Sequence, residues 1–253
     1  MQLVTTTDDG GEGEPLVYVP GVDGTGDLLL GTALNLRRSF RLVRLRYRSE
    51  VIPSVGNGYH EFADAIVHAL GEIDIQRAIL LAESFGVAVA LQTALDYPDR
   101  VRALALVNGF ARHASPLKLS MTRLVFPMLT RRLFRLGRRF AIPFGMLAPR
   151  RNAHVQRAML DLTGDYIDAA FLRRLAMISK VDLTPRLADL KLPVALFASD
   201  RDRIVSSVSC ARAMAAVLPD ATLELLSGAG HIVLPFEEEP WVDRLLALQE
   251  RAN

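Results

Sequence analysis

Ser84 lies where one apolar run of the sequence ends and another begins. Residues 79–82 form a short apolar run typical of a buried strand, and the residues after Ser84 are apolar with good helix formers among them. The sequence therefore predicts a strand, a sharp turn with Ser84 at its apex and a helix, which is how a nucleophilic serine is presented. Ala82 and Gly86 are the small residues that such a turn requires on either side. The alternative is a strand that leads into a helix with Ser84 as an ordinary N-cap.

A serine hydroxyl is a weak nucleophile and needs a base within hydrogen-bond reach, which an acid holds in turn. Candidates for both follow predicted strands further along the chain: Asp202 comes just after the strand at 192–200, and His231 follows the strand at 221–226. Functional groups gather at the carboxyl ends of parallel strands, so these loops can meet. Asp200 is an alternative acid, and a structural histidine in a glycine-rich turn is the alternative for His231.

Strands and helices alternate along the chain. The apolar patterns predict strands at 2–7, 16–19, 40–47, 79–82, 101–108, 192–200 and 221–226. They predict helices at about 27–37, 60–70 and 206–217, after Ser84, and from about Pro240 onward, with a turn-rich connection at 8–15. Several strands are almost wholly apolar, which is typical of strands buried on both faces. The predicted fold class is α/β, with a mainly parallel, doubly wound sheet.

Residues 112–180 interrupt this alternation. They contain helical stretches, prolines at 116, 127, 143 and 149 and no convincing strand, so we expect a helical cap inserted into a core formed by residues 1–111 and 181–253. The insertion holds 14 Lys and Arg against three acids, a net charge of +11, whereas the rest of the chain carries −9. The arginine-rich stretch 129–140 resembles a helix face that binds a membrane surface or an anionic partner. The alternative is a basic face that is only exposed to solvent.

The composition excludes several classes of protein. Half of the 253 residues are hydrophobic, and Cys210 is the single cysteine, so neither an internal disulfide nor a cysteine-based metal cluster is expected. The sequence contains no P-loop, dinucleotide fingerprint or metal-ligand cluster, so we expect no cofactor, no metal and no nucleic acid partner. No apolar run approaches the roughly 18 residues of a membrane span, and the first residues lack a signal-peptide pattern, so a cytoplasmic protein is expected.

The chain resembles the α/β-hydrolases over nearly its whole length. The shared features are a glycine-rich loop after a core strand, the turn at Ser84, an acid in the context Asp-x-Ile-Val and a Gly-x-Gly-His motif, in that order. The loop at 20–26, Pro-Gly-Val-Asp-Gly-Thr-Gly, is similar to that of hydrolase-like acyltransferases related to plant phytyl ester synthases. The chain departs from the family at Ala82, at Val87 and at Pro20, where glycine, glycine and histidine are more usual.

This resemblance implies a Ser-Asp-His triad with an oxyanion hole. In such a triad Ser84 attacks an acyl carbonyl, His231 accepts and later returns the proton, and Asp202 orients the imidazole. The backbone N–H groups of Val22 and Phe85 would hold the oxyanion.

Other residues near these motifs are expected to have structural roles. Asp23 and Thr25 would shape the loop by side-chain to backbone hydrogen bonds, and Glu83 would pack or hydrogen-bond beneath the turn. Surface or packing roles are expected for the remaining histidines, which are His60, His68, His113 and His154.

The apolar residues of the insertion would suit a medium or long acyl chain, and ordinary packing between helices is the alternative. They are Leu117, Met121, Leu124, Phe126, Met128, Leu129, Phe134, Phe140, Phe144, Met146 and Leu147.

Three functions are open at this stage. The first is an intracellular serine hydrolase that cleaves carboxylic esters of apolar acyl groups, with a small-molecule ester as its substrate and an acyl-enzyme on Ser84. The second is an acyltransferase or thioesterase whose anionic acyl donor, an acyl-carrier protein, CoA or a phospholipid, is attracted by the arginines of the cap. The third is a non-catalytic ligand-binding protein on a hydrolase scaffold.

Overall fold

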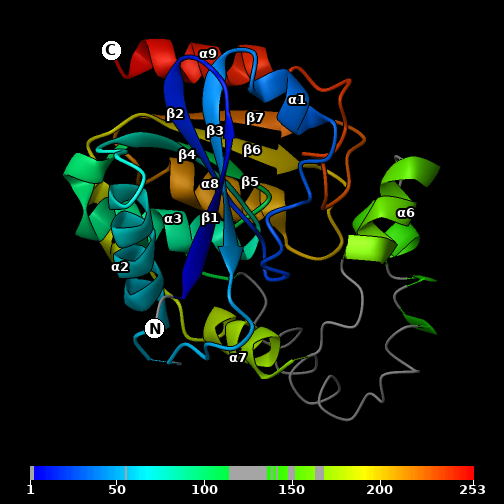
Figure 1. Ribbon diagram of the computed structural model, residues 1–253. Coiled ribbons are helices and arrows are strands. Elements are labelled where there is room, and N and C mark those ends of the chain that lie inside the picture. The colour runs from blue at the N-terminus through cyan, green and yellow to red at the C-terminus, as the bar shows by residue number, and fades with distance from the viewer. Residues whose placement is uncertain are drawn as a thin grey trace.

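A computed structural model describes residues 3–54, 56–113, 136–137, 139–140, 142–147, 152–162 and 168–253. The centre of this described part is a seven-stranded sheet (Figure 1). Its strands are β1 (Val4–Gly10), β2 (Glu14–Val19), β3 (Phe40–Tyr47), β4 (Ala78–Glu83), β5 (Val101–Val107), β6 (Val194–Ser199) and β7 (Ala221–Leu226). They lie in the order β1-β3-β2-β4-β5-β6-β7. Only the pair β1 and β3 is antiparallel, so within the described chain the predicted mainly parallel sheet is confirmed.

The central strands are buried on both faces because alternate side chains enter two different apolar clusters. In β2, Val17 and Val19 face one cluster, whereas Leu16 and Tyr18 face the other. Every residue of β4 is buried, as is every residue of β6. These strands therefore form a rigid platform whose carboxyl ends can position side chains accurately.

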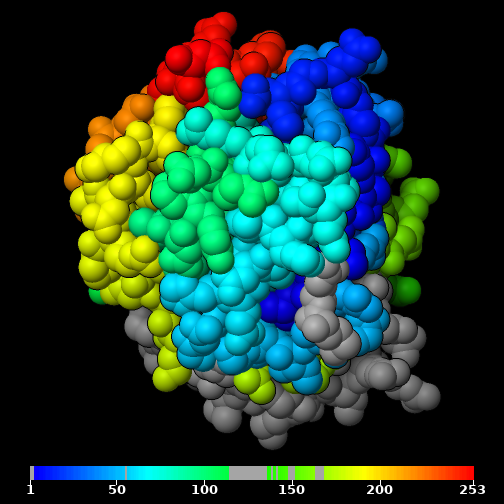
Figure 2. Space-filling model, turned by 60° about the vertical axis from the view of Figure 1, so that its left-hand side comes forward, coloured from blue at the N-terminus to red at the C-terminus, as the bar shows by residue number. Residues whose placement is uncertain are grey.

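Helices cover both faces of the sheet (Figure 1). The α-helices whose bounds lie within the described residues are α1 (Thr32–Leu36), α2 (Gly58–Gly71), α3 (Phe85–Asp96), α6 (Ala153–Leu162), α7 (Ala169–Ile178), α8 (Ser207–Ala215) and α9 (Trp241–Arg251). Side chains of α2, α3 and α8 enter the cluster on one face, and those of α1 and α9 enter the cluster on the other. In the space-filling view the residues of α2 (cyan) lie on the outside of their face (Figure 2). Most residues of α3, in contrast, are buried.

Short helical turns connect these elements. They are the 3-10 helices η1 (Pro98–Arg100) and η4 (Thr184–Asp189) and the π-helix η3 (Ile142–Met146). The helix predicted at 27–37 is wrong in its first half, because α1 begins only at Thr32. Leu30 has a φ of 47°, which an α-helix of L-residues does not accommodate, so the chain reaches α1 through turns.

The described part of the predicted cap contains η3, α6 and α7 and no strand. An isolated antiparallel bridge joins Arg112 to Asp182, next to the expected start and end of the insertion. The division into core and cap stays a prediction. Of the apolar cap residues, Phe140 and Phe144 are exposed, Met146 is half-buried and Leu147 is buried.

Much of the cap lies outside the described residues. This applies to most of the arginine-rich stretch 129–140 and to Leu117, Met121, Leu124, Phe126, Met128, Leu129 and Phe134. Within the described residues, no helix has both the length and the apolar character needed to span a membrane.

Candidate active site

Ser84 stands between the last residue of β4 and the first residue of α3. Its backbone has a φ of 53° and a ψ of −120°, a sparsely populated conformation that persists only where the surrounding structure enforces it. The Ser84 N–H donates to the carbonyl of Val107 over 3.0 Å, which anchors the turn to β5. Within the described chain the Ser84 hydroxyl makes no capping hydrogen bond, and the backbone is not that of an ordinary N-cap. The predicted strand, sharp turn and helix are confirmed.

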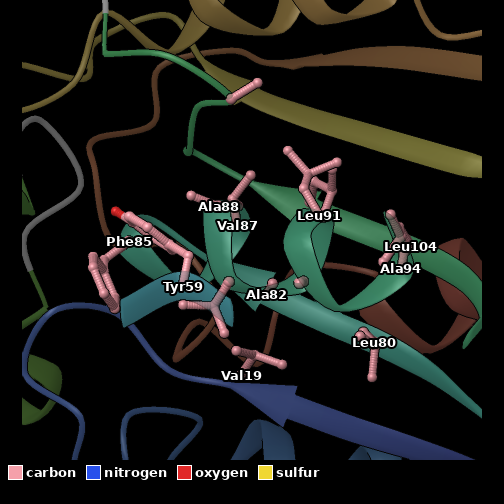
Figure 3. Packing of buried hydrophobic residues seen from close by; sticks show 14 of the residues in the cluster. Val19, Tyr59, Leu80, Ala82, Phe85, Val87, Ala88, Leu91, Ala94 and Leu104 are labelled. Carbon is pink, nitrogen blue, oxygen red and sulfur yellow. The ribbon is translucent and has the colours of Figure 1, made fainter. Parts of the chain in front are cut away.

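The turn leaves room only for small residues beside Ser84. A Cβ atom on Gly86 would lie 2.5 Å from the carbonyl oxygens of both Val19 and Pro20, which is far inside contact distance. Ala82 is fully buried and packs in the apolar cluster around the turn (Figure 3). The absence of a side chain at residue 86 therefore lets the loop after β2 approach the nucleophile turn closely.

The structure brings His231 and Asp202 to Ser84 from the loops after β7 and β6. The Oγ of Ser84 lies 3.0 Å from Nε2 of His231, and the Nδ1 of His231 lies 2.8 Å from Oδ2 of Asp202. His231 is 3% exposed, so this hydrogen-bonded chain is shielded from water. Its geometry allows the hydroxyl proton to pass to the imidazole while the carboxylate stabilises the imidazolium.

Asp202 is held as a carboxylate by four hydrogen bonds. Its Oδ1 accepts from the backbone N–H groups of Ile204 over 2.8 Å and Val205 over 3.0 Å, and its Oδ2 accepts from the Ser207 hydroxyl and from His231. Burial by itself would raise the pKa of Asp202, but His231 and these hydrogen bonds hold that pKa below its ordinary value. Burial likewise opposes the imidazolium, yet the facing carboxylate outweighs burial and raises the pKa of His231.

Asp200, the alternative acid, points elsewhere. Its Oδ1 accepts the backbone N–H of Gly228 over 2.8 Å. This hydrogen bond joins the loop after β6 to the turn that precedes His231. Of the two aspartates, Asp202 is thus the one that contacts the imidazole.

The loop expected to carry the oxyanion hole lies directly against Ser84. A Cβ atom on Gly21 would be 3.6 Å from the Cβ of Ser84, so Val22 is adjacent to the nucleophile. Phe85 is the first residue of α3, and the N–H groups of a first helical turn have no acceptor within the helix. Both residues proposed for the oxyanion hole therefore lie close to Ser84 along the chain or across the loop contact. The oxyanion role of Val22 and Phe85 stays a prediction.

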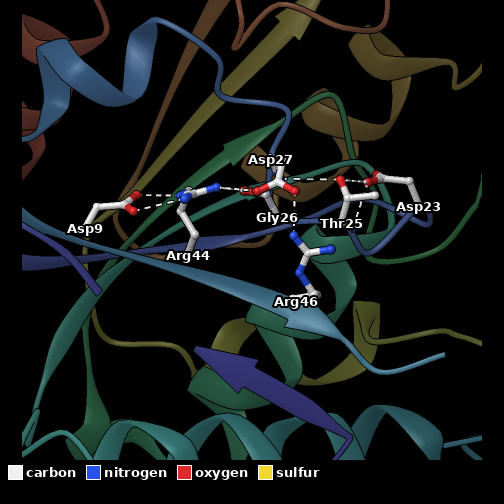
Figure 4. A network of polar contacts seen from close by, with 7 residues as sticks. All are labelled: Asp9, Asp23, Thr25, Gly26, Asp27, Arg44 and Arg46. Carbon is white, nitrogen blue, oxygen red and sulfur yellow. Dashed lines mark hydrogen bonds and ion pairs between the residues drawn. The ribbon is translucent and has the colours of Figure 1, made fainter. Parts of the chain in front are cut away.

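Side chains within and beside this loop fix its shape. The Oδ1 of Asp23 accepts hydrogen bonds from the backbone N–H of Thr25 over 2.9 Å and from its hydroxyl over 2.8 Å, as predicted. An ion-pair network then joins the loop to the edge of the sheet through Arg44, which bridges Asp9 and Asp27 (Figure 4). The loop is thereby tied to β1 and β3 rather than free in solvent.

Asn108, which the sequence analysis missed, connects the acid and histidine loops. Its Nδ2 donates to the carbonyl of His231 over 2.7 Å and to the Ser199 hydroxyl over 2.8 Å, and its Oδ1 accepts the Ser199 N–H over 2.8 Å. Asn108 is buried with a φ of 48°. An asparagine at the end of a buried strand was the available signal, because Asn tolerates this left-handed conformation better than most residues.

Arg174 corrects one expectation for the basic cap. It is one of the 14 basic residues counted in the insertion, whose arginines are expected to attract an anionic donor, but its side chain is 2% exposed in α7 and turned toward the core. Ala170, Met177 and Ile178 are buried on the same helix. The spacing i, i+4, i+7 and i+8 places Arg174 on the buried stripe, and this periodicity was the signal that could have revealed it.

Glu83 is buried beneath the turn, as predicted, and accepts a hydrogen bond from the hydroxyl of Tyr18. Burial, helped by the nearby Asp23 carboxylate, raises the pKa of Glu83 to about 7. The side chain is thus a second titratable group close to the candidate site.

The remaining histidines have partners outside the chain of Ser84, His231 and Asp202. The Nδ1 of His60 is 2.6 Å from an oxygen of Asp96, His68 is exposed beside Glu72, and the ring of His113 packs edge-on against Phe110. His154 is exposed in α6. Among the described residues, no group of three or more His, Cys, Asp and Glu side chains is arranged to hold a metal ion.

Comparisons with known proteins agree with this architecture. Relatives at 28% identity include the "Putative carbamate hydrolase RutD" of Enterobacter cloacae, with 93% of this chain and 91% of that protein covered. Similar solved structures include an esterase from Thermogutta terrifontis, with a TM-score of 0.82, 22% identity and coverage of 98% of this chain and 93% of that one. Another is the enol-lactonase of Burkholderia xenovorans LB400, with a TM-score of 0.83, 17% identity and coverage of 98% and 96%.

Solved structures at such low identity show only the fold. The family to which the chain belongs is shown by a match to a protein-family model. The model of the family described as serine aminopeptidase, S33, matches residues 50–239, which is well over half of the chain. The matched segment includes Ser84, Asp202 and His231. The chain therefore belongs to the serine aminopeptidase S33 family, a hydrolase family of the α/β-hydrolase superfamily.

Proposed function

We propose that the protein is a serine hydrolase that cleaves carboxylic esters of apolar acyl groups through an acyl-enzyme on Ser84. The observation that carries the proposal is the chain of contacts from Ser84 Oγ to His231 Nε2, 3.0 Å, and from His231 Nδ1 to Asp202 Oδ2, 2.8 Å. A nucleophile, a base and an orienting acid within hydrogen-bond reach are what acyl transfer to a serine requires.

In the acylation step, Ser84 Oγ forms a bond with the ester carbonyl carbon while Nε2 of His231 takes the hydroxyl proton. The carbonyl oxygen becomes an oxyanion, which the N–H groups of Val22 and Phe85 would stabilise together with the positive end of α3. The bond from carbon to the alcohol oxygen then breaks, and the imidazolium gives its proton to the departing alcohol. Asp202 keeps the imidazole oriented and balances its positive charge throughout.

Deacylation repeats these steps with water. His231 removes a proton from water, whose oxygen bonds to the acyl carbon, and the Ser84 oxygen leaves with the proton that the imidazolium returns. The products are a carboxylic acid and the free enzyme, so atoms and charges balance over the cycle.

An apolar cluster beside the histidine supports the proposal of an apolar acyl group. Ile232, the residue after His231, is buried with residues of η3 and α6, including Ile142, Val155 and Met159. The N–H of Ile232 also donates to the carbonyl of Met146 over 3.1 Å. The part of the cap that is described here thus presents apolar side chains close to the candidate base.

A carbamate is the second candidate substrate. Its support is the 28% identity to the RutD relatives, whose name refers to carbamate hydrolysis. A carbamate carbonyl can be attacked by the same serine, but its nitrogen lowers the electrophilicity of the carbonyl. Ester and carbamate hydrolysis would then share Ser84 and differ in the acylation rate.

The experiment is hydrolysis of p-nitrophenyl esters with acyl chains of two to sixteen carbons, beside p-nitrophenyl carbamates, by the wild type and by Ser84→Ala. The proposal expects wild-type turnover with an optimum at an apolar chain and none in the variant. Faster carbamate than ester turnover would favour the second candidate. If the wild type shows no turnover but a fluorophosphonate labels Ser84, acyl transfer or a thioester donor is favoured. If Ser84 is not labelled either, a binding protein is favoured.

The basic cap bears on the alternative of an acyltransferase or thioesterase, for which it would be the site of an anionic acyl donor. Attraction by the cap arginines would make kcat/KM for an anionic donor fall sharply with salt while a neutral ester is unaffected. Equal salt dependence for both substrates would remove the anionic partner or membrane surface from the proposal.

A further inference from the structure

Arg174 reaches from α7 to the backbone of the loop that lies against Ser84. Its Nε donates to the carbonyl of Val22 over 2.8 Å, and its Nη2 lies 3.4 Å from the carbonyl of Asp23. The guanidinium also lies over the ring of Tyr47, and its Cζ is 5.7 Å from the ring centroid. A buried arginine that donates to two consecutive backbone carbonyls is an unusual use of a charge that is costly to desolvate.

The two contacts complete a pattern in which each carbonyl from Pro20 to Gly24 has a donor. The Tyr47 hydroxyl donates to Pro20 over 2.9 Å, the Gly24 N–H donates to Gly21 over 3.1 Å, and the Tyr47 N–H donates to Gly24 over 2.8 Å. Arg174 supplies the donors for the two carbonyls between them. The loop carbonyls are thus all engaged by the protein.

A hydrogen bond to a loop carbonyl also fixes the direction of the N–H group in the same peptide. In a trans peptide the C=O and N–H point in opposite directions, so the hydrogen bond from Gly24 to the Gly21 carbonyl turns the Val22 N–H away from the loop interior. The next peptide carries the Val22 carbonyl, and Arg174 holds it. The peptide after that carries the Asp23 carbonyl, which Arg174 also contacts, and the Gly24 N–H that donates to Gly21. If Arg174 released both carbonyls, these two peptides could rotate and the hydrogen bond from Gly24 to Gly21 could break. The Gly21–Val22 peptide would then lose its anchor, and the Val22 N–H could turn with it.

We infer that Arg174 is a positioning residue that holds the Val22 N–H in the orientation needed for the oxyanion hole and thereby couples α7 of the cap to the catalytic core. The inference rests on the proposed function, because an oxyanion hole has a role only in acyl chemistry at Ser84. The cap then contributes to the rate of the chemical step and not only to substrate binding.

The chemistry of the guanidinium suits this role. Its planar fork can donate to two carbonyls at once, whereas a lysine ammonium is a point charge that reaches them with less defined geometry. Burial lowers the pKa of Arg174, while Asp168, Tyr47 and Asp23 act in the opposite direction and favour its charged form. A positive charge behind the loop also favours the negative charge that develops on a substrate oxygen.

The test compares Arg174→Ala, Arg174→Gln and Arg174→Lys with the wild type and with Arg173→Ala, a matched control in the same helix. We expect kcat on the preferred p-nitrophenyl ester to fall about tenfold to a hundredfold in Arg174→Ala, somewhat less than the loss of an oxyanion donor itself costs. KM should stay within about threefold, because the effect lies in the transition state. Arg174→Lys should retain part of the rate, and Arg173→Ala should match the wild type.

Chemical rescue distinguishes positioning from a purely structural role. Free guanidinium ion, at a concentration well below that which unfolds the protein, should restore part of the kcat of Arg174→Ala and leave the wild type and Arg173→Ala unchanged. Wild-type kcat in a folded Arg174→Ala, or a loss that neither guanidinium nor lysine restores, would overturn the inference. Failure of every variant at residue 174 to fold would also overturn it, since the role would then be structural.

Failure of the proposed function has a different signature. If the wild type turns over no ester, the proposed function has failed, and the rate of fluorophosphonate labelling of Ser84 replaces kcat in the comparison of the variants. If the wild type is active and Arg174→Ala equals it, only the inference about Arg174 has failed.

Discussion

The side-chain Nδ2 of Asn108 donates a hydrogen bond of 2.7 Å to the backbone carbonyl of His231. The same side chain exchanges hydrogen bonds with Ser199, which precedes the loop of Asp202. A residue at the end of β5 thus fixes the distance between the candidate base and the candidate acid.

Replacement of Asn108 should weaken both the fold and the site. Asn108→Gly leaves buried donors and acceptors of Ser199 and His231 unpaired, so we expect the free energy of unfolding to fall by about 3 kcal/mol. Asn108→Ala should lose about 1 kcal/mol more, because alanine resists the φ of 48°. Urea denaturation measures both, and kcat should fall about tenfold as the histidine loop loosens. Greater stability of the alanine variant would show that the backbone conformation does not matter.

Asp202 and Asp200 offer a matched pair of substitutions. Asp202→Asn keeps the shape of the side chain but removes the charge that stabilises the imidazolium, so kcat should fall about 10³–10⁴-fold. Asp200→Asn should change kcat only slightly, because Asp200 contacts the Gly228 N–H and not the imidazole. Steady-state kinetics on one ester decides between them. Equal losses in both variants would contradict the assignment of Asp202 as the acid.

The pH dependence of kcat/KM should report the raised pKa of His231. Only the neutral imidazole can accept the serine proton, so activity should rise with pH to a plateau, with a midpoint above the ordinary histidine value of 6.5. The cause of the shift is the Asp202 carboxylate, so Asp202→Asn should move the midpoint of the residual activity to lower pH. A midpoint that the substitution leaves unchanged would assign the titration to another group.

The same shifts predict how stability depends on pH. The raised pKa of His231 stabilises the fold at pH values below the pKa of histidine in the unfolded chain, and this contribution is lost as pH rises through the folded-state pKa. The lowered pKa of Asp202 acts in the other direction: its contribution is present above the unfolded-state pKa and is lost as pH falls through the folded value.

Glu83 should destabilise the protein when it ionises. Its pKa is raised from 4.5 to about 7, so the folded state binds a proton more tightly than the unfolded state, and stability should decrease as pH rises between these values. A shift of this size corresponds to roughly 3 kcal/mol. Glu83→Gln keeps an acceptor for Tyr18 and should be more stable than the wild type above pH 7. Parallel curves of unfolding free energy against pH for the two proteins would contradict this.

The sheet and the meeting of Ser84, Asp202 and His231 could be predicted because both depend on local signals. Apolar runs of four to eight residues mark buried strands, and Ser84 and Asp202 closely follow such runs. His231 follows the more exposed strand at 221–226 after a glycine-containing turn. Parallel strands place their carboxyl ends at one edge, so sequence order alone was enough to bring the three loops together.

Contacts that depend on distant backbone atoms could not be predicted. The carbonyl that Arg174 holds belongs to Val22, 152 residues earlier in the chain, and a count of charges treats a buried arginine as a surface one. The early part of the helix expected at 27–37 was also wrong, because Leu30 adopts a left-handed conformation that a leucine does not signal. Propensity is a weak guide where tertiary contacts decide.

The central claim is that Ser84 carries the acyl group, and mass spectrometry of the acid-quenched protein and of its peptides tests it most directly. The wild type and Ser84→Ala are mixed with the preferred p-nitrophenyl ester, quenched in acid within the first turnovers and digested for site assignment. We predict an added acyl mass on the peptide that contains Ser84, formed at least as fast as kcat, with no adduct and a rate at least about 10⁴-fold lower in the variant. Turnover by the wild type without this adduct, or undiminished turnover by Ser84→Ala, would contradict the account.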